Sequence, residues 1–278
     1  PTNEYQPDNA FTLVRYLSRE QYGSTPLLHG QYYGAPYELD QKYYWAPLNG
    51  KYKKAPAPVD VKYDRAGKML FPRMYSTDDR HIRFYESYTN GKGTPVQGAQ
   101  YKKPTQGANL SYFFDFQLGW MYWRYFMWNF VGRQNEIHTP SADMFTGNWE
   151  SGIPFIDKIH LGDQSNAPQW LKDNPGKNHY YFLPLLLGLL GLCFQFDKDR
   201  RGCWLTFLLF FMTGIAIVLY LNQSPYQVRE RDYAYAGSFY AFAIWIGFAV
   251  AALYSWITSA LKGKHAVAVA SVASVACL

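Results

Sequence analysis

Cysteine and histidine are scarce in this chain, and neither residue forms a cluster. The 278 residues include three cysteines and six histidines. Cys193, Cys203 and Cys277 lie in or beside apolar runs, which suits buried small side chains better than a disulfide framework or a thiolate metal site. The histidines, at positions 29, 81, 138, 160, 179 and 265, show no metal-ligand spacing. We therefore expect neither a bound metal nor a cofactor.

Other familiar motifs are missing as well. The chain has no glycine-rich phosphate loop and no nucleophile elbow. Its net charge of +6 is spread over many segments and forms no basic stripe, so nucleic acid is not an expected partner.

Apolar residues are concentrated after Tyr180, whereas most charges precede it. Three uncharged runs, 180–196, 203–221 and 237–261, have lengths typical of transmembrane helices. The last residues, 265–278, are too few to cross about 30 Å of hydrocarbon at about 1.5 Å per residue. The sequence thus predicts an all-α polytopic membrane protein, and we expect an internal fragment that begins at Pro1 without a signal segment and stops inside a fourth span.

The third run contains a strip of small residues, Ala243, Gly247 and Ala251, which recur every four positions. Such a strip predicts close approach of another helix.

Short-loop charge predicts the orientation of these spans. Lys198, Arg200 and Arg201 follow the first run, and Lys262 and Lys264 follow the third. The positive-inside rule places both loops in the cytoplasm. Everything before Tyr180, including the loop 137–179, is then extracytoplasmic, and the expected location is a bacterial inner membrane.

Residues 1–108 are turn-rich, with many tyrosines and prolines. Three copies of a Tyr-x-x-Ala-Pro pattern occur in QYYGAP at 31, KYYWAP at 42 and KYKKAP at 51. They predict extended, Pro-bounded segments whose tyrosines either pack together or offer flat faces to a ligand such as a sugar.

An aromatic helix is expected within 109–136. Its Trp and Tyr content suits an interfacial or re-entrant position, although a true crossing and a soluble core helix remain alternatives. Arg124 interrupts the aromatic residues, and Arg133, Gln134 and Asn135 follow them. These four polar residues are candidates for binding a lipid headgroup or sugar hydroxyls, and a polar helix cap is the alternative for the last three.

Four consecutive charges, Arg229, Glu230, Arg231 and Asp232, precede the third run. Arginine suits bidentate phosphate recognition, so this stretch is a candidate contact for a polyprenyl-phosphate headgroup. Because the charges alternate, they could instead form an ion cluster that joins two helices, or simply be solvated.

Five stretches carry a family resemblance: REQYG (19–23), YWRYFMWNFVGRQNE (122–136), NWESGIPFID (148–157), LPLLLGLLGL (183–192) and YLNQSPYQVRERDYAYAGSFYAFAIWIG (220–247). Together they resemble a family of large multispanning membrane proteins of Bacteroidetes-type bacteria, known as a domain of unknown function. That family is similar to the animal transmembrane O-mannosyltransferase that acts on plexin-type receptors, and through it to the GT-C class of glycosyltransferases.

The resemblance implies a GT-C-like membrane enzyme that transfers a mannose-like sugar from a polyprenyl-phosphate carrier to an extracytoplasmic protein or glycan. In that family the catalytic acid is expected in a Trp-Asp-x-x-Glu-like segment after the first membrane helix. No such segment occurs here, so no catalytic residue is carried over, and we expect these residues alone to be inactive. The alternative is a non-catalytic transporter or a scaffold for envelope assembly. Membrane lipids are expected partners in either case.

Overall fold

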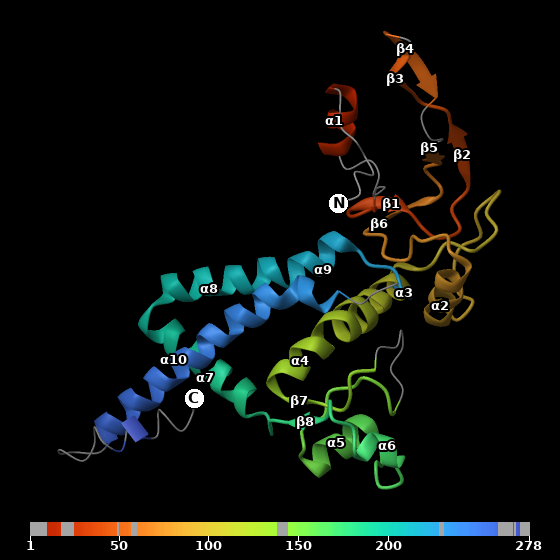
Figure 1. The fold of residues 1–278 in the computed structure, drawn as a ribbon. Coiled ribbons are helices and arrows are strands. Elements are labelled where there is room, and N and C mark those ends of the chain that lie inside the picture. Colours follow the sequence, from red (N-terminus) through yellow and green to blue (C-terminus); the bar gives the residue numbers. More distant parts are fainter. Residues whose placement is uncertain are drawn as a thin grey trace. The chain divides into compact units, whose positions relative to one another are not determined.

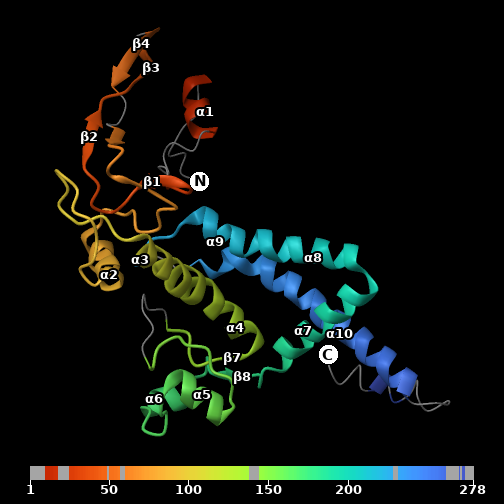
Figure 2. The same ribbon diagram turned by 180° about the vertical axis from the view of Figure 1, so that it is seen from behind.

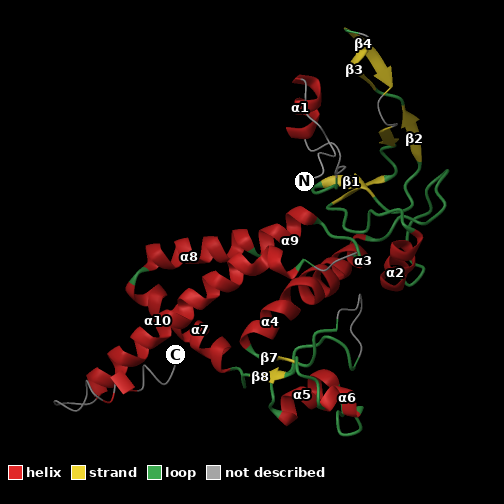
Figure 3. Ribbon diagram, viewed as in Figure 1, coloured by secondary structure: helices red, strands yellow, loops and turns green. Residues whose placement is uncertain are grey.

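The computed structural model describes residues 10–17, 25–48, 50–56, 60–137, 144–227 and 231–260, together with 269, 271 and 272. The chain divides into two compact units, Pro1–Tyr112 and Phe113–Leu278, which are taken in turn. Figures 1 and 2 show the elements from opposite sides, and Figure 3 distinguishes helices from strands.

The first unit contains three nested antiparallel strand pairs. β3 pairs with β4 innermost, β2 with β5 outside them, and β1 with β6 outermost. The strands are β1 (His29–Gln31), β2 (Tyr37–Asp40), β3 (Tyr43–Leu48), β4 (Lys51–Pro56), β5 (Asp60–Tyr63) and β6 (Lys68–Leu70). Two copies of the Tyr-x-x-Ala-Pro pattern are thus the two strands of one hairpin, with Tyr43 opposite Pro56 and Pro47 opposite Tyr52. Each strand has only one partner, so a proline without an N–H is tolerated there.

Aromatic rings form the core of the first unit. Its helices are α1 (Ala10–Leu17), α2 (Asp79–Thr89) and α3 (Gln106–Ser111). Tyr33 and Tyr85 are buried with ring centroids 5.5 Å apart, and Tyr85 meets Tyr112 edge-on at 5.1 Å. Burial raises the pKa of Tyr33 to about 12, because the phenolate would lose its hydration. Tyrosines therefore fill much of this interior, because the segment has few aliphatic residues with which to fill it.

The second unit is mostly helical. It contains η2 (Tyr112–Trp123), α4 (Arg124–Phe130), β7 (Gly132–Arg133), α5 (Pro154–Leu161), α6 (Gln169–Lys172), β8 (Asn178–His179), α7 (Leu183–Lys198), α8 (Arg200–Thr213), α9 (Ile215–Leu221), η3 (Asp232–Tyr235) and α10 (Ala236–Ala260). Phe126 and Phe130 of α4 pack on Phe242 of α10 with centroids 4.9 and 4.5 Å apart. The aromatic stretch is thus a helix, π-helical over η2, and most of its rings are buried. The interfacial or re-entrant position of this helix in a membrane stays a prediction.

α7 and α10 pack closely and run parallel. A Cβ at Gly188 would overlap the ring of Phe242, and one at Gly191 would overlap the carbonyl oxygen of Trp245. Later residues of α7 thus meet later residues of α10, and the first residues of both helices lie at the same end of the pair. Two glycines on α7 allow this approach because they remove the side chains that would separate the backbones.

The predicted strip of small residues lies on another face of α10. Ala243, Gly247 and Ala251 are exposed, and no described atom outside its own helix lies within 4 Å of a Cβ built at Gly247. The close helix contact uses the face of α10 that carries Trp245 and Ala249.

The expected all-α polytopic fold is wrong. Paired β-strands build much of the first unit, and only Arg200–Leu221 and Asp232–Ser259 among the described residues form helices long and apolar enough to cross a membrane. α7, which occupies most of the first expected span, has 16 residues and does not meet that length. The fourth expected span, 265–278, lies almost entirely outside the described residues. Two such helices indicate membrane association only weakly, because the core helix of a soluble protein meets the same criteria.

Candidate polar site at the start of α7

Three short extended segments meet just before α7. β7 pairs with β8, placing Gly132 opposite His179, and Arg133 also bridges to Trp149. Because side chains alternate along a strand, Glu150 and His179 lie on the face of Gly132, one on each side of it. Gly132 has φ +140°, and a Cβ there would overlap the carbonyl oxygen of Glu150. The missing side chain lets the backbones of both neighbouring segments approach Gly132, which brings Glu150 and His179 to its two sides.

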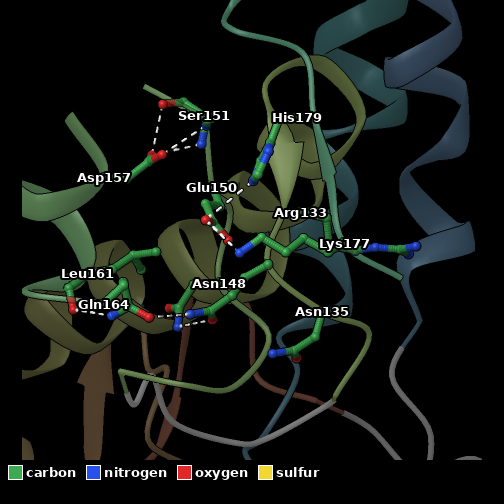
Figure 4. A network of polar contacts seen from close by, with 12 residues as sticks. Arg133, Asn135, Asn148, Glu150, Ser151, Asp157, Leu161, Gln164, Lys177 and His179 are labelled. Carbon is green, nitrogen blue, oxygen red and sulfur yellow. Dashed lines mark hydrogen bonds and ion pairs between the residues drawn. The ribbon is translucent and has the colours of Figure 1, made fainter. Parts of the chain in front are cut away.

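Glu150, Lys177 and His179 form an ionic cluster, named here the Glu150 cluster (Figure 4). Oε1 of Glu150 lies 2.9 Å from Nζ of Lys177 and 3.3 Å from Nε2 of His179. Oε2 of Glu150 is buried and has no hydrogen-bond partner among the described residues. Nε2 of His179 is also buried. Although it lies close to Oε1 of Glu150, the angles at this contact do not fit a hydrogen bond. An acceptor and a ring nitrogen are thus left side by side, which suits a hydroxyl group that both donates and accepts.

A carboxylate on α5 fixes the backbone next to this cluster. Oδ1 of Asp157 accepts hydrogen bonds from the backbone N–H and the hydroxyl of Ser151, each at 2.8 Å. Oδ2 accepts from the N–H of Gly152, also at 2.8 Å. The NWESG segment is therefore fastened to α5 directly after Glu150.

Gln134 and Asn135, predicted as ligand contacts, make internal hydrogen bonds. Nδ2 of Asn148 donates to Oε1 of Gln134 at 3.0 Å, and Nε2 of Gln134 donates to the carbonyl of Met144 at 2.9 Å. Oδ1 of Asn135 accepts from the N–H of Gly147 at 2.8 Å. Both amides are buried and shape the 144–148 loop. As they stand, they do not offer their polar atoms to a ligand.

Arg124 is also buried. Its Nε donates to the carbonyl of Trp120 at 3.0 Å, and its Nη1 donates to that of Gly147 at 3.2 Å. The guanidinium carbon lies 4.1 Å from the ring centre of Trp120 and 4.9 Å from that of Trp128. This arginine fastens the helix to the 144–148 loop.

Arg133 makes fewer internal side-chain hydrogen bonds than Arg124 does. Its Nε donates to the carbonyl of Gly176 at 2.8 Å, and its guanidinium lies 5.4 Å from the ring centre of Trp128. The side chain is partly exposed, and its terminal nitrogens bond to no described residue. Of the three polar residues after the aromatic helix, Arg133 alone retains free donors among the described contacts.

The charged stretch before α10 is only partly described. Arg229 and Glu230 lie outside the described residues. Arg231 and Asp232 are exposed at the start of η3, and neither forms an ion pair with a described residue. The residues that follow these charges, Tyr235 and Ser238, contact Tyr122 within the aromatic helix, whereas the Glu150 cluster lies beside Gly132, after the end of that helix.

Sequence reasoning missed Glu150, Lys177 and His179 as site residues. Glu150 lies in NWESG, which entered only through the family resemblance, and the histidines show no spacing that would select His179. A signal was present: Lys177 and His179 alternate directly before the first apolar run. Only strand pairing shows that both face Glu150. The described part of the chain contains no cluster of three or more Asp, Glu, His and Cys side chains suited to a metal ion.

Comparison with known proteins adds one match. Residues 23–114, about a third of the chain, match a family of unknown function, DUF8416. Comparisons with curated proteins and with solved structures gave no match. The family match covers most of the first unit and leaves the Glu150 cluster outside it.

Proposed function

We propose that the chain is part of a membrane-associated glycosyltransferase that moves a mannose-like sugar from a polyprenyl-phosphate carrier to an extracytoplasmic protein or glycan. The proposal starts from the resemblance to the Bacteroidetes-type family and its O-mannosyltransferase relatives. The structural observation that supports it is the Glu150 cluster, in which a buried carboxylate oxygen and a buried ring nitrogen have no hydrogen-bond partner among the described residues.

The chemistry of these residues suits the donor and the acceptor. Exposed Arg231 and partly exposed Arg133 offer guanidinium donors to a phosphate. Glu150 and His179 offer an acceptor and a ring nitrogen to a sugar or protein hydroxyl. Transfer from a lipid phosphate requires both a phosphate contact and a hydroxyl contact.

The proposed orientation places the first residues of α7 and of α10 outside the cytoplasm of a bacterial inner membrane. Lys198 and Arg201 are exposed at the opposite end, where α7 turns into α8, and the positive-inside rule favours the cytoplasm for them. A reporter fused after Arg201 should behave as cytoplasmic, and one inserted at 224–228 as external. The reverse result would remove the outer-face donor from the proposal.

Transfer assays test the function directly. Arg231→Lys keeps the charge but loses the planar fork, and Glu150→Gln loses the carboxylate. Made in the longer protein of which the chain is proposed to be part, both should lower transfer from polyprenyl-phosphate mannose, measured per molecule of protein in membrane vesicles. Arg201→Lys, an equally exposed arginine change at the other helix end, should leave transfer unchanged. Normal specific activity in both test variants would contradict the proposal.

A non-catalytic scaffold is the second candidate. The internal hydrogen bonds of Gln134, Asn135 and Asn148 favour it, since these amides support the loop rather than a ligand. A scaffold predicts that the Glu150 variant loses abundance in the membrane, whereas the enzyme predicts lost activity at normal abundance.

A further inference from the structure

α5 exposes apolar side chains that its own unit does not cover. Phe155 is 75% exposed and Ile159 is 71% exposed, and their four-residue spacing puts them on one face of the helix. Asp157 and Leu161 are buried on another face. α5 is therefore amphipathic, with its inner face fixed by Asp157 and its outer face open among the described residues.

The segment just before α5 lies next to the start of α7. A Cβ at Gly152, two residues before α5 begins, would lie 2.8 Å from the ring of Tyr181. Tyr181 is itself exposed and is followed by exposed Leu183 at the start of α7. Exposed apolar side chains thus occur both on α5 and at the start of α7.

α7 links this surface to a helix that could cross a membrane. It packs along α10 through Gly188 and Gly191, and its open side carries exposed Leu186 and Leu189. If α10 lies in hydrocarbon, these leucines face the same medium. Tyr180 and Tyr181 then mark the level where the hydrocarbon ends, which is the depth that aromatic rings with polar groups prefer.

Two exposed lysines lie beside these apolar side chains, together with the exposed carboxylates of Asp163 and Asp173. Lys158 is exposed between Phe155 and Ile159, and Lys172 on α6 is exposed two residues after exposed Trp170. Lysine beside large apolar side chains suits an anionic headgroup layer, because the long stem lies along the apolar surface while the ammonium reaches phosphate.

We propose that α5 is an interfacial anchor that binds the surface of an anionic bilayer. Phe155 and Ile159 enter the boundary between headgroups and acyl chains, and Lys158 pairs with lipid phosphate. Since Asp157 on the same helix holds Ser151 and Gly152, the anchor also sets the position of Glu150 relative to the bilayer. The inference requires a membrane but does not depend on the proposed sugar transfer.

Site-directed spin labelling tests the anchor in the intact chain reconstituted in vesicles. With the three native cysteines replaced, a label is placed by Phe155→Cys or Ile159→Cys. Ser165→Cys, in the exposed loop after α5, is the water control, and Leu208→Cys, exposed on α8, is the lipid control. Labels at 155 and 159 should be several-fold more accessible to oxygen relative to a water-soluble nickel chelate than the label at 165.

Each outcome decides the question. Nickel accessibility at 155 and 159 equal to that at 165 means that the face is in water, and low accessibility to both reagents means that protein covers it; either overturns the anchor. Vesicles with anionic lipid should also draw the label at 155 deeper than zwitterionic vesicles do, and Lys158→Gln should abolish that difference. An unchanged difference in Lys158→Gln would remove Lys158 from the anchor.

Discussion

Trp245 on α10 donates its indole N–H to Oε1 of Gln195 on α7 across 2.9 Å, within the buried surface between the two helices. Nε2 of the same amide points to Oγ1 of Thr206 on α8 at 3.5 Å. One glutamine thus connects three helices whose other contacts are largely apolar.

Gln195→Leu should destabilise this helix group. The substitution leaves the indole N–H of Trp245 buried without an acceptor, which costs about 1–3 kcal/mol. Thermal unfolding in detergent should show a lower midpoint than the parent chain. Cys193→Ala, at an exposed position on the same helix, should change the midpoint little. Equal midpoints for the leucine variant and the parent would mean that the amide contributes nothing.

Gly191→Ala should weaken the contact between α7 and α10. The added methyl would overlap the carbonyl oxygen of Trp245, and overpacking of this kind costs about 1–3 kcal/mol. Gly247→Ala is the matched control, because its Cβ would enter open space and alanine favours the helix. The melting temperature should fall for the first variant and hold or rise for the second. A fall of equal size in both would show that close packing is not the cause.

Asp157→Asn should loosen the segment that carries Glu150. The carboxylate accepts three hydrogen bonds, whereas an amide offers one acceptor oxygen, so about 1–3 kcal/mol should be lost. Limited proteolysis should cut the 144–182 region faster. Asp163→Asn serves for comparison, since that exposed carboxylate accepts from Ser165, in the loop after α5. Unchanged cleavage of the Asp157 variant would contradict the role given to this carboxylate.

Acidification should destabilise α2 through His81. Burial lowers the pKa of His81, opposed by Asp78 and reinforced by Arg80, and its Nδ1 lies 2.7 Å from Oγ of Ser76. The unfolded chain therefore binds the proton first: stability is intact above the ordinary histidine pKa of about 6.5 and is lost as pH falls below it. Hydrogen exchange of α2, corrected for its intrinsic pH dependence, should quicken between pH 7.5 and 5.5.

Replacing the histidine provides the check. His81→Gln should remove most of this pH dependence, and His29→Gln, at an exposed position in β1, should retain it. A pH dependence that survives in His81→Gln would assign the effect to another group.

The sequence by itself indicated the long apolar helices and the extended segments of the first unit, but not the shorter helices α2, α5 and α6. Uncharged runs gave α8–α9 and α10 close to their expected bounds, because helix formation in an apolar run depends on local composition and length. Proline and tyrosine alternation likewise indicated extended segments, two of which are β3 and β4. Arg133 was chosen from its place after the aromatic helix, and it keeps free donors.

Tertiary structure decided which polar groups meet. Gln134 and Asn135 have the composition of a binding site, yet the 144–148 loop takes up their amides. Glu150 and His179 are far apart in sequence and meet only because strand register sets them on both sides of Gly132. The sequence also did not show which face of α10 packs against α7. Gly188 and Gly191 of α7 make the close approach, and the predicted strip of small residues on α10 does not take part. Pairing and packing depend on the partner segment, and a pattern read along one segment contains no information about its partner.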